Sequence, residues 1–258
     1  MTGSRTMIDL VKLVDYTDDY LNASRFRDYC PNGLQVEGKS EVHKLASGVT
    51  ASMAFIEAAL DGGADCLLVH HGYFWKNEVS SITGMKKRRL QALLGADVSL
   101  LAYHLPLDAH PIVGNNAQIA HRLGFSVLGG LQKNENFPIG NVGELEREQS
   151  VDSLVEHCEH VFGRAVTHVN AGPAQIRRIA WCTGAAQHMI EDAVAQDVDV
   201  YLSGEISEQT AHVARECGIH YIAAGHHATE RYGVQALGEH LADKFGLQHQ
   251  FVDIDNPA

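Results

Sequence analysis

The chain has 258 residues, of which 45% are hydrophobic and 20% are charged. This length and composition are typical of a globular protein with one large or two modest domains. The 32 Asp and Glu outnumber the 20 Lys and Arg and give a net charge of -12, so nucleic-acid phosphates and anionic lipids are disfavoured as partners.

The first half of the chain alternates helix and strand patterns. Apolar residues at helical spacing predict a helix over 8–21, and 44–49 and 65–70 read as buried strands. Between those strands, 52–60 is predicted to be helical, with Ser52 as its N-cap. This order predicts right-handed βαβ units, hence an α/β fold with largely parallel sheets flanked by helices.

The pattern continues in the second half. The apolar run 100–103 is predicted to be another strand, and the glycines of 129–143 are interpreted as turns around a hairpin. A strand over 222–224 leads into a predicted helix that runs on through Leu237. The basic run 86–89 is interpreted as a solvated helix face.

The two halves also resemble each other. Residues 45–71 align with 179–205 at a shift of 134 with seven identities, and 101–108 align with 223–230 at a shift of 122. The 12-residue excess falls in the loop 72–85. Chance similarity of two βαβ units is the alternative, but both registers occur in the same chain order.

We therefore predict an internal duplication that builds two similar, interlinked α/β lobes, over residues 1–130 and 131–258, with a site between them. The helix of the second lobe that matches the opening helix is predicted over 153–162.

Cysteine usage and apolar runs bear on the compartment. The five cysteines are odd in number, scattered and never in a CxxC pair. This usage favours a reducing cytoplasm and argues against a disulfide framework or a thiolate zinc site. Residues 1–9 hold no apolar stretch of signal-peptide length, and the longest apolar runs are only strand-sized. We expect a cytoplasmic chain with no membrane span.

Histidines and acidic residues occur where strands are predicted to end, which is where ligands collect in open parallel sheets. His70 and His71 close one strand. Neighbouring strand residues point to opposite faces, so both rings can serve one site only if the backbone turns, which Gly72 permits. The alternative is one hydrogen-bonded core histidine and one surface histidine.

Two further groups follow the other strands. His104 lies four residues before Asp108, and His226 lies four residues before Glu230. On a helix, His226 and Glu230 would share one face and could bind one metal, although a simple surface pair has the same spacing. The sequence has no G-x-S-x-G elbow, phosphate loop, H-E-x-x-H helix or G-x-G-x-x-G turn.

Several segments together resemble a known family, the Nif-three-like dinuclear-metal proteins labelled GTP cyclohydrolase 1 type 2 homologues. The similarity covers nearly the whole chain in order and is greatest to the short bacterial members without a large central insertion. The segments are PNGLQVEG (31–38), GVTAS (48–52), VHHGYFW (69–75), HLPLD (104–108) and GHHATE (225–230).

The resemblance implies a ligand set and an assembly. It implies that two divalent metal ions are bound by His70, His71, Asp108, His226 and Glu230. By the same resemblance His227 has a supporting or structural role and His104 lines the cavity. The family forms a ring-shaped homohexamer with metal sites facing an internal cavity, and this is the expected assembly.

Two functional hypotheses follow. Imidazole and carboxylate ligands suit Zn, Fe, Mn, Co or Ni, and two such ions about 3.5–4 Å apart catalyse hydrolysis. The first hypothesis is a hydrolase of a nucleotide or cyclic C–N bond, with Glu205 or His104 in proton transfer; GTP as a substrate rests on the family label. The alternative is a metal carrier or regulatory protein without turnover.

Overall fold

The computed structural model of the protein describes residues 6–133 and 135–258. The expectation for residues 1–9 therefore lies partly outside the described residues. The chain divides into two compact units: unit 1 is Met1–Leu107 with Gly233–Asp255, and unit 2 is Asp108–Tyr232 with Asn256–Ala258.

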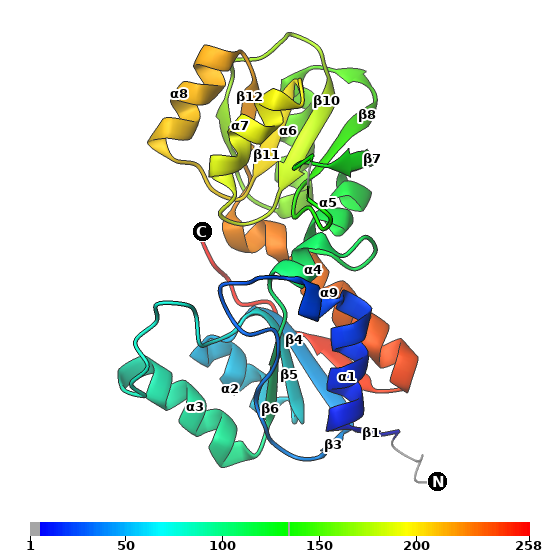
Figure 1. Cartoon of the computed structure of the whole chain (residues 1–258), viewed down its shortest axis with the longest axis vertical. Helices are drawn as coiled ribbons and strands as arrows, with labels where there is room; N and C mark the ends of the chain where they lie inside the picture. The colour runs from blue at the N-terminus through cyan, green and yellow to red at the C-terminus, as the bar shows by residue number, and fades with distance from the viewer. Residues whose placement is uncertain (1–5, 134) are drawn as a thin grey trace. The chain divides into compact units, whose positions relative to one another are not determined.

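Helices and strands alternate along the chain, as the sequence predicts (Figure 1). No helix in the described ranges combines the length and the apolar character that crossing a bilayer requires. The helices are α1 (Leu10–Leu21), α2 (Met53–Asp61), α3 (Gly84–Ala96), α4 (Leu105–Ala109), α5 (Asn115–Leu123), α6 (Val151–Phe162), α7 (Ile190–Ala195), α8 (Glu208–Cys217) and α9 (His226–Phe245), with short 3-10 turns η1 (Ala23–Arg25) and η2 (Gln187–Met189). The strands are β1 (Ile8–Asp9), β2 (Gly33–Val36), β3 (Glu41–Val42), β4 (Lys44–Thr50), β5 (Cys66–His71), β6 (Ser99–Ala102), β7 (Phe125–Gly130), β8 (Asn141–Gln149), β9 (Thr167–Val169), β10 (Ile176–Cys182), β11 (Val200–Ser203), β12 (His220–Ala223) and β13 (Gln248–Phe251).

The main sheet of unit 1 has the order β13-β4-β5-β6-β2. Its pairings are parallel except for β2, which runs antiparallel to β6. The predicted β4-α2-β5 unit is confirmed: Ser52 caps α2 by accepting a hydrogen bond from the amide of Phe55 at 3.2 Å. The parallel core strands are buried almost throughout, because helices cover both faces of the sheet.

Helices α2 and α3 cover one face of this sheet, and α1 and the part of α9 from Gly233 onward lie on the other (Figure 1). Phe55 and Ile56 of α2 and Leu93 of α3 belong to a single buried apolar cluster with the strands. On the other side the His240 ring of α9 stacks on Tyr20 of α1 at 4.2 Å between centroids. In α3, Lys87 and Arg88 are exposed, as predicted for the basic run.

The sheet of unit 2 has the order β7-β8-β10-β11-β12-β9. Only β10-β11 and β11-β12 are parallel among these pairings. The prediction of largely parallel sheets is therefore corrected for unit 2, because antiparallel strands lie on both sides of its parallel core. β8 pairs antiparallel with β10 and forms a hairpin with β7, and β9 pairs antiparallel with β12 at the other edge. The predicted hairpin is confirmed, although Gly129 and Gly143 lie within its strands.

Two apolar clusters fill the faces of the unit 2 sheet. One joins α5, α6 and the first turns of α9 to the strands and contains the fully buried Trp181. The other packs α7 and α8 against the opposite face and contains Tyr201 and Tyr221. Helices thus cover both faces of this sheet as well.

The central strands of the two sheets have the same order. In each unit three consecutive parallel strands (β4-β5-β6 and β10-β11-β12) are followed by an antiparallel edge strand, β2 or β9. This shared arrangement is consistent with the predicted duplication. The excess loop 72–85 of the first half lies between β5 and α3 and continues into the first residues of that helix.

The compact units divide the chain at other places than residue 130. Residues 108–130 belong to unit 2, since α5 packs into its core. Residues 233–255 belong to unit 1, since β13 pairs in parallel with β4. The sequence could not predict that residues 233–255 pack in unit 1, because strand pairing between residues so far apart leaves no local sequence pattern.

Two histidines lie side by side at the β9 edge of unit 2. The rings of His168 and His220 are 5.5 Å apart, and His168 Nε2 and His220 Nδ1 are buried without a hydrogen-bond partner among the described residues. Burial, and then the neighbouring His220, lower the pKa of His168 below 6.5, while Asp152 opposes the shift. A protonated His168 is therefore disfavoured in the folded chain.

We expect the stability of unit 2 to fall as the pH drops from about 7.5 to about 5, since the unfolded chain binds more protons below its own pKa. Replacing His168 by Asn should make this fall smaller. The measurement is urea unfolding followed by Trp181 fluorescence in a Trp75→Phe background. His121→Asn, at an exposed position of α5, is the control; equal pH dependence in both variants would contradict the expectation.

Candidate metal centre

Unit 1 brings three imidazoles together at the carboxyl ends of two neighbouring strands. His70 and His71 end β5, and His104 follows β6, its parallel neighbour. One nitrogen of each ring lies within 4.8 Å of the others. His70 is fully buried and His71 half-buried. The predicted His70-His71 cluster is confirmed as a group that could hold a metal ion, and His104 joins it.

The backbone holds the first two rings in place. His70 Nδ1 donates to the carbonyl oxygen of Tyr103 at 2.9 Å, and His71 Nδ1 lies 3.3 Å from the hydroxyl of Thr50. Gly72 follows at a point where a Cβ would overlap the side chains of Gln35 and Ala102. Close packing therefore favours glycine at this position.

His104 is held by Asp28, a residue that the sequence analysis did not single out. His104 Nδ1 donates to Asp28 Oδ1 at 2.7 Å, and the Asp28 side chain is 2% exposed. Burial alone would raise the pKa of Asp28, but its hydrogen bond with His104 and the charge of His104, with bonds from Asn32 and Leu105, lower it. Asp28 thus stays a carboxylate that fixes the orientation of His104.

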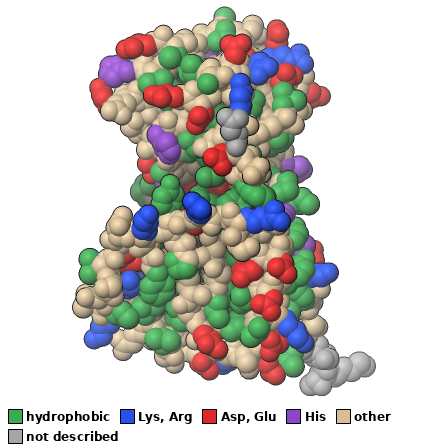
Figure 2. Space-filling model, in the orientation of Figure 1, with side chains coloured by type: hydrophobic (Ala, Val, Ile, Leu, Met, Phe, Trp, Pro, Cys, Tyr) green, Lys and Arg blue, Asp and Glu red, His purple; other side chains and the backbone are tan. Residues whose placement is uncertain are grey.

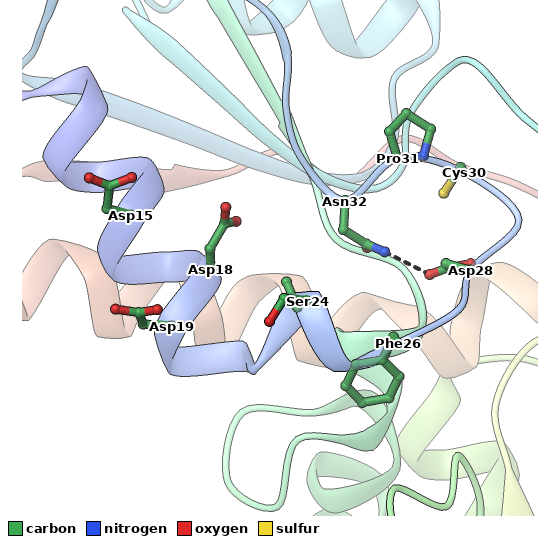
Figure 3. Close-up of a pocket in the computed structure, with 10 residues that line it drawn as sticks. Asp15, Asp18, Asp19, Ser24, Phe26, Asp28, Cys30, Pro31 and Asn32 are labelled. Atoms are coloured by element: carbon green, nitrogen blue, oxygen red, sulfur yellow. Dashed lines mark hydrogen bonds between the residues drawn. The ribbon is translucent and has the colours of Figure 1, made fainter.

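Asp28 also lines a pocket of about 620 Å³ in unit 1. Figure 3 shows this pocket between α1, which contributes Asp15, Asp18 and Asp19, and the loop that carries Asp28. Acidic side chains gather on the surface over α1 in Figure 2. The negative charge on this side of unit 1 favours cations and disfavours anions.

Unit 2 carries the other predicted ligands, two of them on α9. His226 and Glu230 are one helical turn apart, with Nε2 3.2 Å from Oε2. Glu205, at the end of β11, lies 2.7 Å from His226 Nδ1. Burial would lower the pKa of His226, but hydrogen bonds and charge from Glu230 and Glu205 raise it to about 9. The predicted i,i+4 pair on a helix is confirmed.

Gly184 leaves the space that the Glu230 carboxylate occupies. Its φ is +66°, and a Cβ there would overlap Glu230 Oε1 and come within 3.3 Å of His226 Nε2. Glu230 is only 3% exposed. The end of β10 is therefore shaped around this carboxylate.

Asp108 is buried and held by side chains from two other elements. Its Oδ1 accepts hydrogen bonds from Asn115 Nδ2 at 2.9 Å and from Thr183 Oγ1 at 3.1 Å. Asn116 donates to the Asp108 carbonyl and accepts from the amide of Thr183. Asp108 bonds to Thr183 and Glu230 faces Gly184, so both carboxylates lie close to the end of β10. Burial raises the pKa of Cys182 well above its ordinary value, and the two carboxylates raise it further.

Three residues beside the candidate ligands occupy matching places in the sequence repeat. At the shift of 134, Thr183 and Gly184 align with Val49 and Thr50, the end of the first strand of each repeat. Thr50 contacts His71 in unit 1 just as Gly184 faces Glu230 in unit 2. Asp28 lies outside the aligned ranges 45–71 and 101–108, so the repeat gave no indication of its role.

The remaining candidates have more limited contacts. Glu205 is 41% exposed at its side chain and is placed to orient His226. The backbone amide of His227 donates to the carbonyl of Ala258 at 3.2 Å. A role of Glu205 in proton transfer and a supporting role of the His227 ring stay predictions.

The donor atoms fit a divalent metal ion. The described residues include groups of His, Asp and Glu that could hold one. The predicted ligands contribute imidazoles and carboxylates and no thiolate, a set that suits Zn, Fe, Mn, Co or Ni. The space beside Gly184, which a Cβ would fill, accommodates one carboxylate of this set.

Comparisons of the sequence with known proteins all point to the same family. Residues 8–257 match the family described as Duf34/NIF3 (NGG1p interacting factor 3). A Pseudomonas aeruginosa protein named GTP cyclohydrolase 1 type 2 homolog is 55% identical over 97% of this chain and 99% of its own. One of the same name from Allochromatium vinosum is 54% identical over 98% of each chain.

A solved structure has the same fold over the whole chain. It is titled as the protein ybgI of unknown function, is 46% identical, and covers 97% of this chain and 100% of its own with a TM-score of 0.94. The relatives are matched along nearly their full length, so the similarity extends over both units. The chain belongs to the Duf34/NIF3 family.

Proposed function

We propose that the protein is a metal-dependent hydrolase with a dinuclear metal centre. The proposed ligands are His70, His71, Asp108, His226 and Glu230. The observation that carries the proposal is the gathering of buried and half-buried imidazoles and carboxylates near the carboxyl ends of central strands. Two divalent ions, when bound, supply Lewis acidity and activate water for hydrolysis.

The chain's own residues prepare this centre. Tyr103 and Glu205 hold the Nδ1 atoms of His70 and His226, which fixes the rings. Asn115 and Thr183 hold the Asp108 carboxylate. Such held side chains lose little freedom when a metal binds, and this preorganisation supports tight binding.

The substrate class is proposed from the names of the relatives. Two relatives are named GTP cyclohydrolase 1 type 2 homolog. We therefore propose a nucleotide or another cyclic C–N compound, with hydrolytic opening of a C–N bond. The ring-shaped homohexamer and the cytoplasm are proposed with it, and light scattering would measure six times the mass of 28.1 kDa if the hexamer forms.

The test is a steady-state assay of the metal-loaded protein with GTP and a panel of nucleotides and cyclic amides. The control is the His70→Ala/His71→Ala variant, which should lose metal and turnover. Turnover equal to this control would overturn the hydrolase. If metal is bound but passes quickly to a chelator and an apo-acceptor without turnover, the alternative of a metal carrier is supported instead.

A further inference from the structure

Two histidines of unit 2 share one face of the sheet, at the opposite end of β12 from the candidate ligand His226. His220 begins β12, whereas His226 follows the end of that strand. In the antiparallel pairing of β9 with β12, His168 lies opposite Ile222. Residues two apart on a strand share a face, so His168 and His220 are diagonal neighbours. Their ring centroids are 5.5 Å apart.

Each ring has one buried nitrogen whose bonding capacity is unused within the chain. His168 Nε2 and His220 Nδ1 are buried and have no hydrogen-bond partner among the described residues. The whole His220 side chain is enclosed, with an exposure of 1%. Because a buried polar atom without a partner costs folding free energy, native proteins rarely leave one unsatisfied. Two such nitrogens on neighbouring rings point to a bound ligand that they share.

The contacts of His220 determine what its Nδ1 can offer. His220 Nε2 donates to the carbonyl oxygen of Pro173 at 2.9 Å. A carbonyl oxygen only accepts, so Nε2 carries the proton and Nδ1 of the neutral ring has the lone pair. Gly172 allows the loop to approach this closely, since a Cβ there would overlap the His220 ring. A backbone carbonyl behind an imidazole is a usual support of a metal-binding histidine.

His168 can also offer a lone pair at neutral pH. Burial, and then the neighbouring His220, lower the pKa of His168, while the charge of Asp152 opposes the shift. The ring is therefore neutral, and ligation through Nε2 requires only that its proton lies on Nδ1. Asp152, in the first turn of α6, adds a negative charge that favours a cation beside the pair.

The separation of the two rings favours a metal ion over a bridging water molecule. A tetrahedral zinc ion about 2.05 Å from both nitrogens would place the ring centroids about 5.2 Å apart. A water molecule about 2.9 Å from both nitrogens, at the same angle, would place them about 6.6 Å apart. The centroids are 5.5 Å apart, which is nearer to the value for the metal ion.

We propose that His168 Nε2 and His220 Nδ1 bind one zinc ion in a second metal site, which joins the edge strand β9 to β12 in unit 2. The proposal goes beyond the proposed function and does not rest on it. Water completes the coordination, and the half-buried His168 gives the ion a path from solvent. The ion is structural, and its binding should stabilise the folded unit 2.

The experiment uses the full chain as the His70→Ala/His71→Ala variant, so that the centre of the proposed function is disabled. The protein carries ¹⁵N-labelled histidine, is freed of metal by a chelator and is titrated with Zn²⁺. We expect one Zn²⁺ per chain and shifts of the His168 Nε2 and His220 Nδ1 resonances in the imidazole NMR spectrum. The His220 Nε2–H signal should persist. Mg²⁺, which prefers oxygen ligands, should shift neither nitrogen.

His168→Asn in this background should weaken Zn²⁺ binding at least about 100-fold, more than the loss of a supporting residue costs. It should also remove the shift of His220 Nδ1. His121→Asn, at an exposed position of α5, is the matched control and should bind Zn²⁺ as its parent does. Equal binding by the two variants, or equal shifts with Mg²⁺ and Zn²⁺, would overturn the site. His220→Gln, with circular dichroism of each variant, separates lost ligation from a folding defect.

Failure of this proposal and failure of the proposed function give different results. If the His70→Ala/His71→Ala variant binds no Zn²⁺ while the unchanged protein does, the second site is refuted and the proposed centre is supported. If the unchanged protein binds a single Zn²⁺ that His168→Asn removes, the second site is supported and the dinuclear centre is refuted.

Discussion

Replacing Trp181 by Ala is expected to lower the free energy of unfolding of unit 2 by about 3–5 kcal/mol. Trp181 is fully buried in β10 and packs against Phe125 with ring centroids 5.2 Å apart. Its indole N–H donates to the carbonyl of Asn116 at 2.9 Å. The substitution leaves both a cavity and a buried carbonyl that has lost a partner. Urea unfolding followed by circular dichroism measures the loss.

Trp75 offers a matched control in the same chain. It is half-buried, and its indole N–H donates to the carbonyl of Gly72 at 3.2 Å. Trp75→Ala deletes the same atoms but opens less of a cavity, so its cost should be clearly smaller. Equal costs for the two variants would show that Trp181 does not hold the core of unit 2.

The second large effect is expected on metal binding. Glu230→Gln should weaken metal binding by at least about 100-fold, more than the loss of a supporting residue costs. The amide has nearly the shape of the carboxylate but no negative charge to offset the charge of the ion. Calorimetric titration of the metal-free protein with Zn²⁺ or Co²⁺ measures the change.

Glu239→Gln removes the same charge from an exposed position of the same helix. Glu239→Gln should leave the metal affinity unchanged. An equal loss of affinity in both variants would show that the net charge of the chain, and not ligation by Glu230, determines the affinity. Gly184→Ala keeps every charge but pushes its Cβ into Glu230 Oε1. It should weaken metal binding as well, and unchanged affinity would show that Glu230 is not a ligand in its present position.

Local patterns were sufficient for the elements that carry the predicted ligands. The apolar run before His70 and His71 predicted β5, and the spacing of His226 and Glu230 predicted a shared helix face. These features depend on residues within a few positions of one another, so hydrophobic periodicity and helical spacing are enough to predict them. The antiparallel direction of the edge strands of the unit 2 sheet was not predicted, because strand direction depends on partners that are distant in sequence.

The supporting residues were harder to predict than the ligands. Asp28 and His104 are 76 positions apart, and Thr183 and Asp108 are 75 apart. No spacing rule joins residues at such separations. The hydrogen bonds that set the tautomers of the rings are therefore visible only in the folded chain.

The sequence alone determined the alternation of helix and strand, the doubled pattern and the family membership, because each is a property of local order or of similarity along the chain. Only the tertiary structure decided that residues 233–255 return to unit 1 and that Asp28 holds His104. The physical reason is the same in both cases. Strand pairing and buried hydrogen bonds join residues that are distant in sequence, and burial makes those contacts specific.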